Sequence, residues 1–231
     1  MGAMSGVSPQ TIWNRPVRGT RGPHRELSRD QIAAAAIELA DAGGLRSVTM
    51  RAVAEAVGIS AAGLYRYVRS RDELISLMVD AALEDMTLPI PNGDWESQLL
   101  AVAHELLRVY IAHNWLGEAA FGSGAAGPNV LRYFDRCLAI MAALPARAAT
   151  KMEALAMLTG VVSLFARAAA SQPPDPAILF AALDPQAHPN LTAALAAPDQ
   201  PERQPDLFQR TLTSVLSGLL KPPGSGSHGP S

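Results

Sequence analysis

Few residues in this sequence have the type and spacing that catalysis would require. The segment "HELLR" at residues 104–108 begins like a zinc-binding helix, but Arg108 stands where the second histidine would be needed. The sequence also contains no Glu-x-x-His pair for a di-iron site, no Gly-x-Ser-x-Gly nucleophile turn and no glycine-rich phosphate loop. We therefore expect no enzyme, no metal site and no cofactor.

A different chemistry, the recognition of nucleic acid, is favoured by the segment from Val48 to Leu74. Residues 61–63 are Ala-Ala-Gly, and residues 65–67 are Tyr-Arg-Tyr. Small side chains let a backbone approach base edges, while phenols and guanidiniums hold phosphates. Alanine offers a base only a methyl contact, so hydrogen bonds to bases would fall to Arg51, Ser60 or Arg66.

The composition favours a helical protein. The chain has 231 residues, of which 48% are hydrophobic and only 5% aromatic, and alanine dominates the hydrophobic share. A single cysteine, Cys137, excludes an intramolecular disulfide, and the first ten residues lack a signal peptide, so we expect a cytoplasmic protein. The longest apolar run, Ala154 to Ala166, is shorter than the roughly 20 residues that span a bilayer, so no membrane partner is expected.

The charge is unevenly distributed along the chain. Residues 1–72 hold ten arginines and six acidic residues, a net charge of +4, whereas residues 73–231 carry −6. The first third could therefore face a polyanion while the remainder could not.

Helix signals divide the first third into four short helices. Ser28, Thr49, Ser60 and Ser70 each stand where an N-cap is expected, and Gly43-Gly44 and Gly58 stop the first two helices. The third helix should cover "AAGLYRYV" and the fourth should continue to about Leu88, before Pro89. Two helices joined by a short turn at Gly58 have the spacing of a helix-turn-helix.

Later segments predict a larger helical domain. We expect helices around 94–115, from Pro128 to about 144, at 147–170, at "NLTAALAA", and at about 206–220. The domain organisation is then a flexible basic arm at 1–27, a helix-turn-helix domain at 28–72 whose fourth helix is the connector, a ligand-binding and dimerisation domain at 73–220, and a disordered tail at 221–231. The fold class is all-α.

The motif of the first third, "T-x-R-x-V-A-x-x-V-G-I-S-x-x-x-L-Y-R-Y-V-x-S-R-D-E-L", resembles the DNA-binding domain of the TetR family of bacterial transcriptional regulators. The resemblance covers about residues 28–85 closely, and the rest of the chain only in pattern. It implies a homodimer through about 147–170 and 206–220, a palindromic DNA operator, and a small-molecule effector that releases a repressor from DNA.

The resemblance also assigns roles to residues at matching positions. Thr49 and Arg51 would begin the second helix near the DNA backbone, Tyr65 and Tyr67 would touch phosphates, and Arg71 would stand where the family usually has a phosphate-gripping lysine. The full set expected to bind DNA is Thr49, Arg51, Ser60, Ala61, Ala62, Gly63, Tyr65, Arg66, Tyr67 and Arg71. For Tyr65 a second interpretation remains open, in which its ring packs on the fourth helix.

The effector would need a mostly apolar cavity with a few polar groups, which suggests an apolar or aromatic molecule. Residues with such side chains on the later helices are His104, Tyr110, His113, Asn114, Trp115, Phe134, Cys137, Met141, Met152, Met157 and Phe165. Each could instead be an ordinary core residue. An alternative function, a helical module that acts through protein partners, also remains open at this point.

Overall fold

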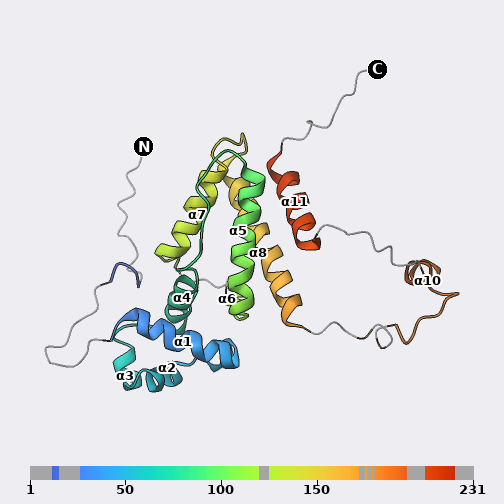
Figure 1. Cartoon of the computed structure of the whole chain (residues 1–231). Coiled ribbons are helices and arrows are strands. Elements are labelled where there is room, and N and C mark those ends of the chain that lie inside the picture. The colour runs from blue at the N-terminus through green and yellow to red at the C-terminus, as the bar shows by residue number, and fades with distance from the viewer. Residues whose placement is uncertain are drawn as a thin grey trace, which may run out of the picture.

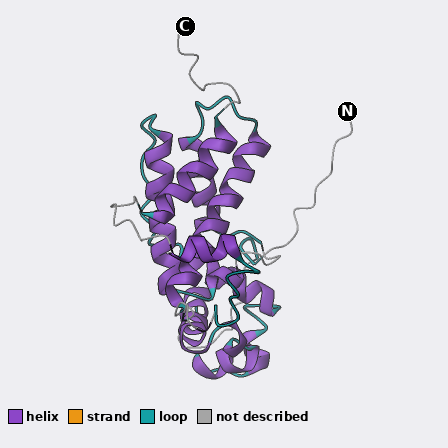
Figure 2. Ribbon diagram, turned by 90° about the vertical axis from the view of Figure 1, so that its right-hand side faces the viewer, coloured by secondary structure: helices purple, strands orange, loops and turns teal. Residues whose placement is uncertain are grey.

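The computed structural model describes residues 12–15, 27–119, 125–171, 175, 178, 180–196 and 206–221, and regular structure within them is helical throughout (Figures 1 and 2). This confirms the predicted all-α fold. In chain order the elements are α1 Arg29–Gly43, the short 3-10 helix η1 Leu45–Ser47, α2 Met50–Ala56, α3 Ala61–Leu64, α4 Arg71–Ala82, α5 Trp95–Ala112, α6 Leu116–Ala119, α7 Pro128–Ile140, α8 Ala148–Ala170, α10 Pro189–Ala196 and α11 Leu207–Leu220.

The predicted helix starts of the headpiece, which comprises α1 to α4, are confirmed. Ser28, Thr49, Ser60 and Ser70 each accept a hydrogen bond from the backbone N–H three residues ahead. Each of these bonds satisfies a donor that the first helical turn would otherwise leave without a partner. Gly58 has a φ of +74°, which lets the chain turn sharply between α2 and α3.

Two of these helices end earlier than predicted. α3 ends at Leu64 rather than Val68, because the backbone tightens and the N–H of Tyr67 donates to the Leu64 carbonyl at 2.9 Å. α4 ends at Ala82 rather than about Leu88. There Arg132, on α7, donates to the carbonyls of Leu83 and Glu84, and so takes the place of the N–H groups of a further helical turn.

The second domain is a bundle in which α5, α8 and α11 pack together, with α7 against α4 and α5 (Figure 1). The apolar stripe of α11 is buried inside the protomer through Phe208, Leu212, Leu216 and Leu220. α10 contains no buried residue and stands apart from the bundle.

Among the described helices, only α8 is long and apolar enough to cross a membrane by length and composition. This helix extends from Ala148 to Ala170, and so includes residues on both sides of the apolar run from Ala154 to Ala166. Its residues Ala154, Leu155, Leu158, Val162 and Ala166 are buried within the protein. The bundle therefore covers one face of α8.

Candidate DNA-binding surface and effector cavity

Most residues predicted to bind DNA lie exposed on α2, α3 and the turns beside them, at one end of the molecule (Figure 1). The exposed members are Thr49, Arg51, Ser60, Ala61, Ala62, Tyr65, Arg66 and Arg71. The Tyr65 side chain is 51% exposed, so its ring does not pack as a core residue on α4. Small residues bordered by an exposed phenol and guanidiniums therefore form one accessible surface.

Gly63 and Tyr67 have more structural roles within this surface. A Cβ atom on Gly63 would lie 3.3 Å from the Ser60 hydroxyl oxygen, which already accepts a hydrogen bond from the Gly63 N–H. A side chain here would therefore crowd the N-cap of α3. Tyr67 is half-buried, and its carbonyl accepts a hydrogen bond from Arg15 at 3.2 Å.

Arg71 is also exposed, but its guanidinium is already hydrogen-bonded to two backbone carbonyls. Its Nε donates to the Val48 carbonyl at 3.1 Å, and one Nη donates to the Leu45 carbonyl at 2.6 Å. The guanidinium thereby ties the first turn of α4 to the segment between α1 and α2. A sequence pattern could not reveal this, because both acceptors are backbone atoms more than twenty residues away.

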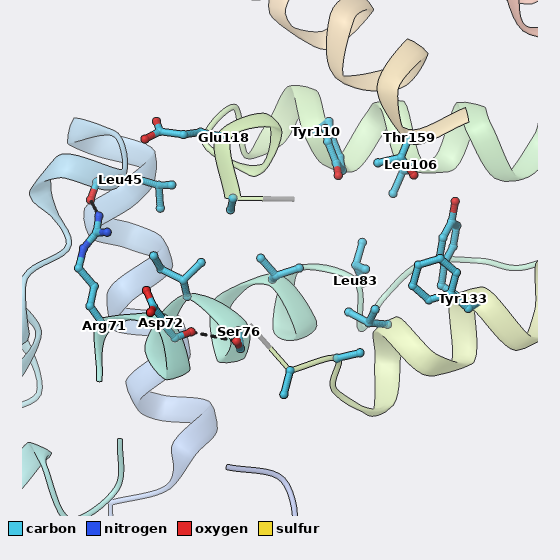
Figure 3. Close-up of a pocket in the computed structure, with 17 residues that line it drawn as sticks. Leu45, Arg71, Asp72, Ser76, Leu83, Leu106, Tyr110, Glu118, Tyr133 and Thr159 are labelled. Carbon is cyan, nitrogen blue, oxygen red and sulfur yellow. Dashed lines mark hydrogen bonds between the residues drawn. The ribbon is translucent and has the colours of Figure 1, made fainter. Parts of the chain in front are cut away.

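A cavity of about 380 Å³ lies where α4 meets α5, α6, α7 and α8 (Figure 3). Its walls come from the headpiece as well as the bundle. The lining residues are Leu45, Arg71, Asp72, Ile75, Ser76, Val79, Leu83, Leu106, Tyr110, Glu118, Ala119, Ala125, Ala126, Val130, Tyr133, Phe134 and Thr159. The volume is within the range that small-molecule sites occupy.

The two ends of this cavity differ in chemistry. Arg71, Asp72 and Glu118 lie toward one end, and Tyr110, Tyr133 and Thr159 toward the other (Figure 3). Burial raises the pKa of Tyr110 to about 12 and that of Tyr133 well above its usual value, so both phenols are protonated at neutral pH. The inner end, defined by these two tyrosines and Thr159, is therefore polar but uncharged.

Of the eleven residues that the sequence suggested for effector binding, Tyr110 and Phe134 line this cavity. Cys137 and Met141 are fully buried core residues, and burial raises the pKa of the Cys137 thiol to about 12. His104 and Phe165 both pack against Phe208, with ring centroids 5.1 and 5.2 Å away. Asn114, Met152 and Met157 are exposed. These residues do not line the cavity because they point to the core, to α11 or to solvent.

His113 and Trp115 anchor the headpiece to the bundle instead. The Trp115 Nε1 donates to Asp41 on α1 at 2.8 Å, and the His113 Nδ1 lies 2.9 Å from the same carboxylate. The sequence analysis placed both residues near the end of a helix and suggested that they bind the effector. It could not show that their partner lies in α1.

The largest group of cavity residues that sequence reasoning missed comes from α4 and its C-cap residue, Leu83. Asp72, Ile75, Ser76, Val79 and Leu83 follow a helical spacing along one face. A second face of the same helix packs into the headpiece through Leu74 and Leu77. The sequence of α4 has apolar residues on two faces. This pattern could have indicated that the helix packs against both domains.

α4 and α7 cap each other's ends. The Asp80 carboxylate accepts a hydrogen bond from the Val130 N–H at 2.9 Å and another from the Asn129 side chain at 3.2 Å. The N-cap of α7, Gly127, has no side chain to do this itself. A Cβ atom there would lie 2.4 Å from Asp80 and from the Trp13 ring, so only glycine fits. In return Arg132 donates to the carbonyls of Leu83 and Glu84, just after the end of α4.

The contact between the end of α4 and the start of α7 is called the joint below. Residues 12–15, part of the arm expected to be flexible, pack across this joint. Ile12 is buried, and the Trp13 Nε1 donates to the Ala125 carbonyl at 3.2 Å, beside the cavity wall. Arg15 forms two hydrogen bonds with the Glu73 carboxylate, at 2.8 and 2.9 Å. This segment therefore touches both the headpiece and the start of α7. The other residues of the arm, apart from Leu27, lie outside the described part.

A helix-turn-helix headpiece is joined through α4 to a helical bundle with a cavity. This arrangement is typical of one-component transcriptional regulators, in which each polypeptide carries both a DNA-binding domain and a ligand-binding domain. Residues 32–78 match the family described as bacterial regulatory proteins, tetR family, and residues 88–222 match the tetracyclin repressor-like C-terminal domain. The chain belongs to the TetR family of DNA-binding transcriptional regulators, which are not enzymes. No cluster of three metal-ligating side chains occurs among the residues described.

Relatives and solved structures agree with this assignment. The transcriptional repressor DrrR1 of Streptomyces coeruleorubidus is 32% identical over 155 residues, which are 66% of this chain and 57% of the relative. A transcriptional regulator of Saccharopolyspora erythraea is 34% identical over 59% of this chain and 58% of its own length. The chain thus spans less than two thirds of these curated relatives.

Among solved structures, apo ActR from Streptomyces coelicolor aligns with a TM-score of 0.70 and 26% identity over 85% of this chain and 98% of its own. A structure of ActR in complex with actinorhodin aligns with a TM-score of 0.68 and 27% identity, over 85% of this chain and 97% of its own.

Proposed function

We propose that this chain is a repressor that binds a palindromic operator as a homodimer and leaves it when a small apolar or aromatic molecule enters the cavity. The observation that carries this proposal is that the cavity is walled by both domains. Leu45 and Arg71 belong to the headpiece, while Tyr110 and Tyr133 belong to the bundle. A molecule between them must favour one relative position of the two domains, and this preference can couple ligand binding to DNA binding.

For DNA, we propose that residues 28–72 form the binding domain and residues 73–220 the ligand and dimerisation domain, as expected from the sequence. Ser60, Ala61, Ala62 and the backbone at Gly63 would face the bases, with Arg51 and Arg66 as hydrogen-bond donors. Thr49, Tyr65 and Tyr67 would hold phosphates. Acting on DNA would place the protein in the cytoplasm.

For the dimer, we propose an interface formed by the outer faces of α8 and α11. Leu164 is 64% exposed and Leu207 is 57% exposed, although both are large apolar side chains. Gly160 on α8 and Gly218 on α11 have open space where a Cβ atom would be, so a second helix could approach closely. A symmetric pairing of these faces would cover them.

For the effector, two observations support an apolar or aromatic molecule. Most cavity-lining residues are apolar, and ActR, which is similar in structure, has been solved with actinorhodin. The effector of this chain would be held by apolar walls with hydrogen bonds at the inner end.

The test is selection of bound sequences from random DNA by the purified full chain. We expect an inverted repeat whose half-sites are about one helical turn apart, roughly 34–36 Å between recognition helices. Binding to bulk DNA should weaken as salt rises. If no sequence is enriched and bulk DNA is not bound, the alternative of a module acting through protein partners replaces this proposal.

A further inference from the structure

We propose that the inner end of the cavity holds a neutral ligand oxygen that accepts a hydrogen bond, such as a ketone or quinone carbonyl, and that the Tyr133 hydroxyl is its donor. This inference rests on the proposed function, because it assigns the ligand chemistry of the same cavity. Tyr133 would thereby distinguish an oxygenated aromatic molecule from the corresponding hydrocarbon.

The hydroxyl groups at the inner end differ in whether they are already used as donors. Thr159 donates to the Leu155 carbonyl at 3.0 Å. Tyr110 is hydrogen-bonded to Ser163, whose own hydroxyl donates to the Thr159 carbonyl at 2.8 Å, so the Ser163 oxygen can accept from the Tyr110 phenol.

Tyr133 is different. Its side chain is 4% exposed, and its hydroxyl has no hydrogen-bond partner among the described residues. Thr159 and Cys137 both lie near this hydroxyl: Thr159 opposes the rise in the pKa of Tyr133 that burial causes, and Cys137 adds to it. Neither side chain forms a hydrogen bond with the Tyr133 hydroxyl. A buried phenol without a partner is destabilising, and an acceptor on a bound molecule would remove that cost. The Tyr133 hydroxyl points toward the same end of the cavity as Tyr110 and Thr159 (Figure 3).

The charges around the cavity restrict the ligand further. The charged lining residues among those described are Arg71, Asp72 and Glu118, at the end opposite the tyrosines (Figure 3). A carboxylate or an ammonium group beside Tyr133 would be buried without a counter-ion, which is strongly unfavourable. The oxygen at the inner end must therefore belong to an uncharged group, joined to a body that fits Leu83, Leu106 and Phe134.

The experiment uses two rigid probes of the same shape, 9-fluorenone, which has a carbonyl, and fluorene, which has a methylene group in its place. Equilibrium dialysis measures both dissociation constants with the full-length wild type, Tyr133→Phe and the matched control Tyr110→Phe. We expect the ratio of the fluorene to the fluorenone dissociation constant to fall by about three- to tenfold in Tyr133→Phe. In Tyr110→Phe the ratio should stay within about twofold of wild type, because that phenol is already hydrogen-bonded to Ser163.

A second readout needs no ligand. Tyr133→Phe removes a hydroxyl that lacks a partner, so the apo variant should melt at the same or a higher temperature than wild type. An unchanged probe ratio in Tyr133→Phe, or a clear loss of apo stability, would overturn the donor assignment. Failure of both probes to bind wild type would overturn the ligand class. These outcomes are independent of the proposed function, whose failure would appear as a lack of DNA binding in the selection experiment.

Discussion

The carboxylate of Asp80, in the last turn of α4, accepts a hydrogen bond from the backbone N–H of Val130, in the first turn of α7, at 2.9 Å. α4 belongs to the headpiece, and α7 forms a wall of the cavity. In the opposite direction, Arg132 on α7 donates a hydrogen bond to the carbonyl of Leu83, the C-cap residue of α4. Each helix therefore supplies a side chain that bonds to the backbone at the end of the other. A displacement of α7 by a ligand must therefore move α4 or break these bonds.

Replacing Asp80 should weaken this joint. Asp80→Ala leaves the Val130 N–H without its acceptor, so we expect a loss of about 1–3 kcal/mol in the free energy of unfolding, measured by urea denaturation. The same variant should show a smaller effect of effector on operator affinity. Asp135→Ala, which removes an exposed carboxylate on α7, is the matched control and should change neither quantity. Equal stability of the two variants would contradict the role of Asp80.

The ion pair between Arg15 and Glu73 should make stability depend on pH. The hydrogen bond from Arg15 lowers the pKa of Glu73 below its usual value, while burial opposes this shift. A carboxylate whose folded pKa is depressed contributes stability above its unfolded pKa, and this contribution is lost as pH falls through the folded value. We therefore expect wild type to lose more stability than Glu73→Gln between about pH 5 and pH 3.

The control for this pair is Arg108 with Glu105, an exposed pair on one helix at 3.0 Å. Arg108→Ala should leave stability nearly unchanged, because exposed pairs contribute little. Arg15→Ala should lower it, since the Arg15 guanidinium donates to the Tyr67 carbonyl as well as to the Glu73 carboxylate. Similar denaturation midpoints for the two variants would show that residues 12–15 do not hold the joint.

The helix starts of the headpiece could be predicted from local sequence signals. The positions of several site residues could not, because they depend on contacts with residues far away in the sequence. The four N-caps could be read from the sequence because each depends on a bond within three residues, as at Ser60 and Gly63. The backbone hydrogen bonds of Arg71 and the exposed position of Met157 could not, because they depend on which distant backbone or helix lies opposite. Tyr133 and Phe134 are neighbours on one amphipathic helix, and only the placement of α7 against α4 brings both to the cavity.

Charging the exposed face of α8 should separate the dimer without unfolding the protomer. Leu164→Glu adds a carboxylate to a side chain that is 64% exposed in the single chain but would be covered in the proposed interface. We expect sedimentation to show a monomer with an unchanged helical circular dichroism spectrum. Leu131→Glu, at a side chain 57% exposed on α7, should remain dimeric. A dimeric Leu164→Glu variant would place the interface elsewhere.

Arg51 and Arg71 should affect DNA binding in different ways, although both are arginines near the start of a headpiece helix. Arg51 is exposed on α2, so its guanidinium can reach a base, and Arg51→Ala should reduce discrimination between operator and random DNA by about 1–3 kcal/mol. Arg71 donates to the carbonyls of Val48 and Leu45, so Arg71→Ala should lower the free energy of unfolding and alter the response to effector. The deciding measurement is the dependence of DNA affinity on salt. An Arg71→Ala slope equal to that of wild type supports the structural role, whereas a slope shallower by about one unit would mean that Arg71 leaves its carbonyl partners on DNA and grips a phosphate.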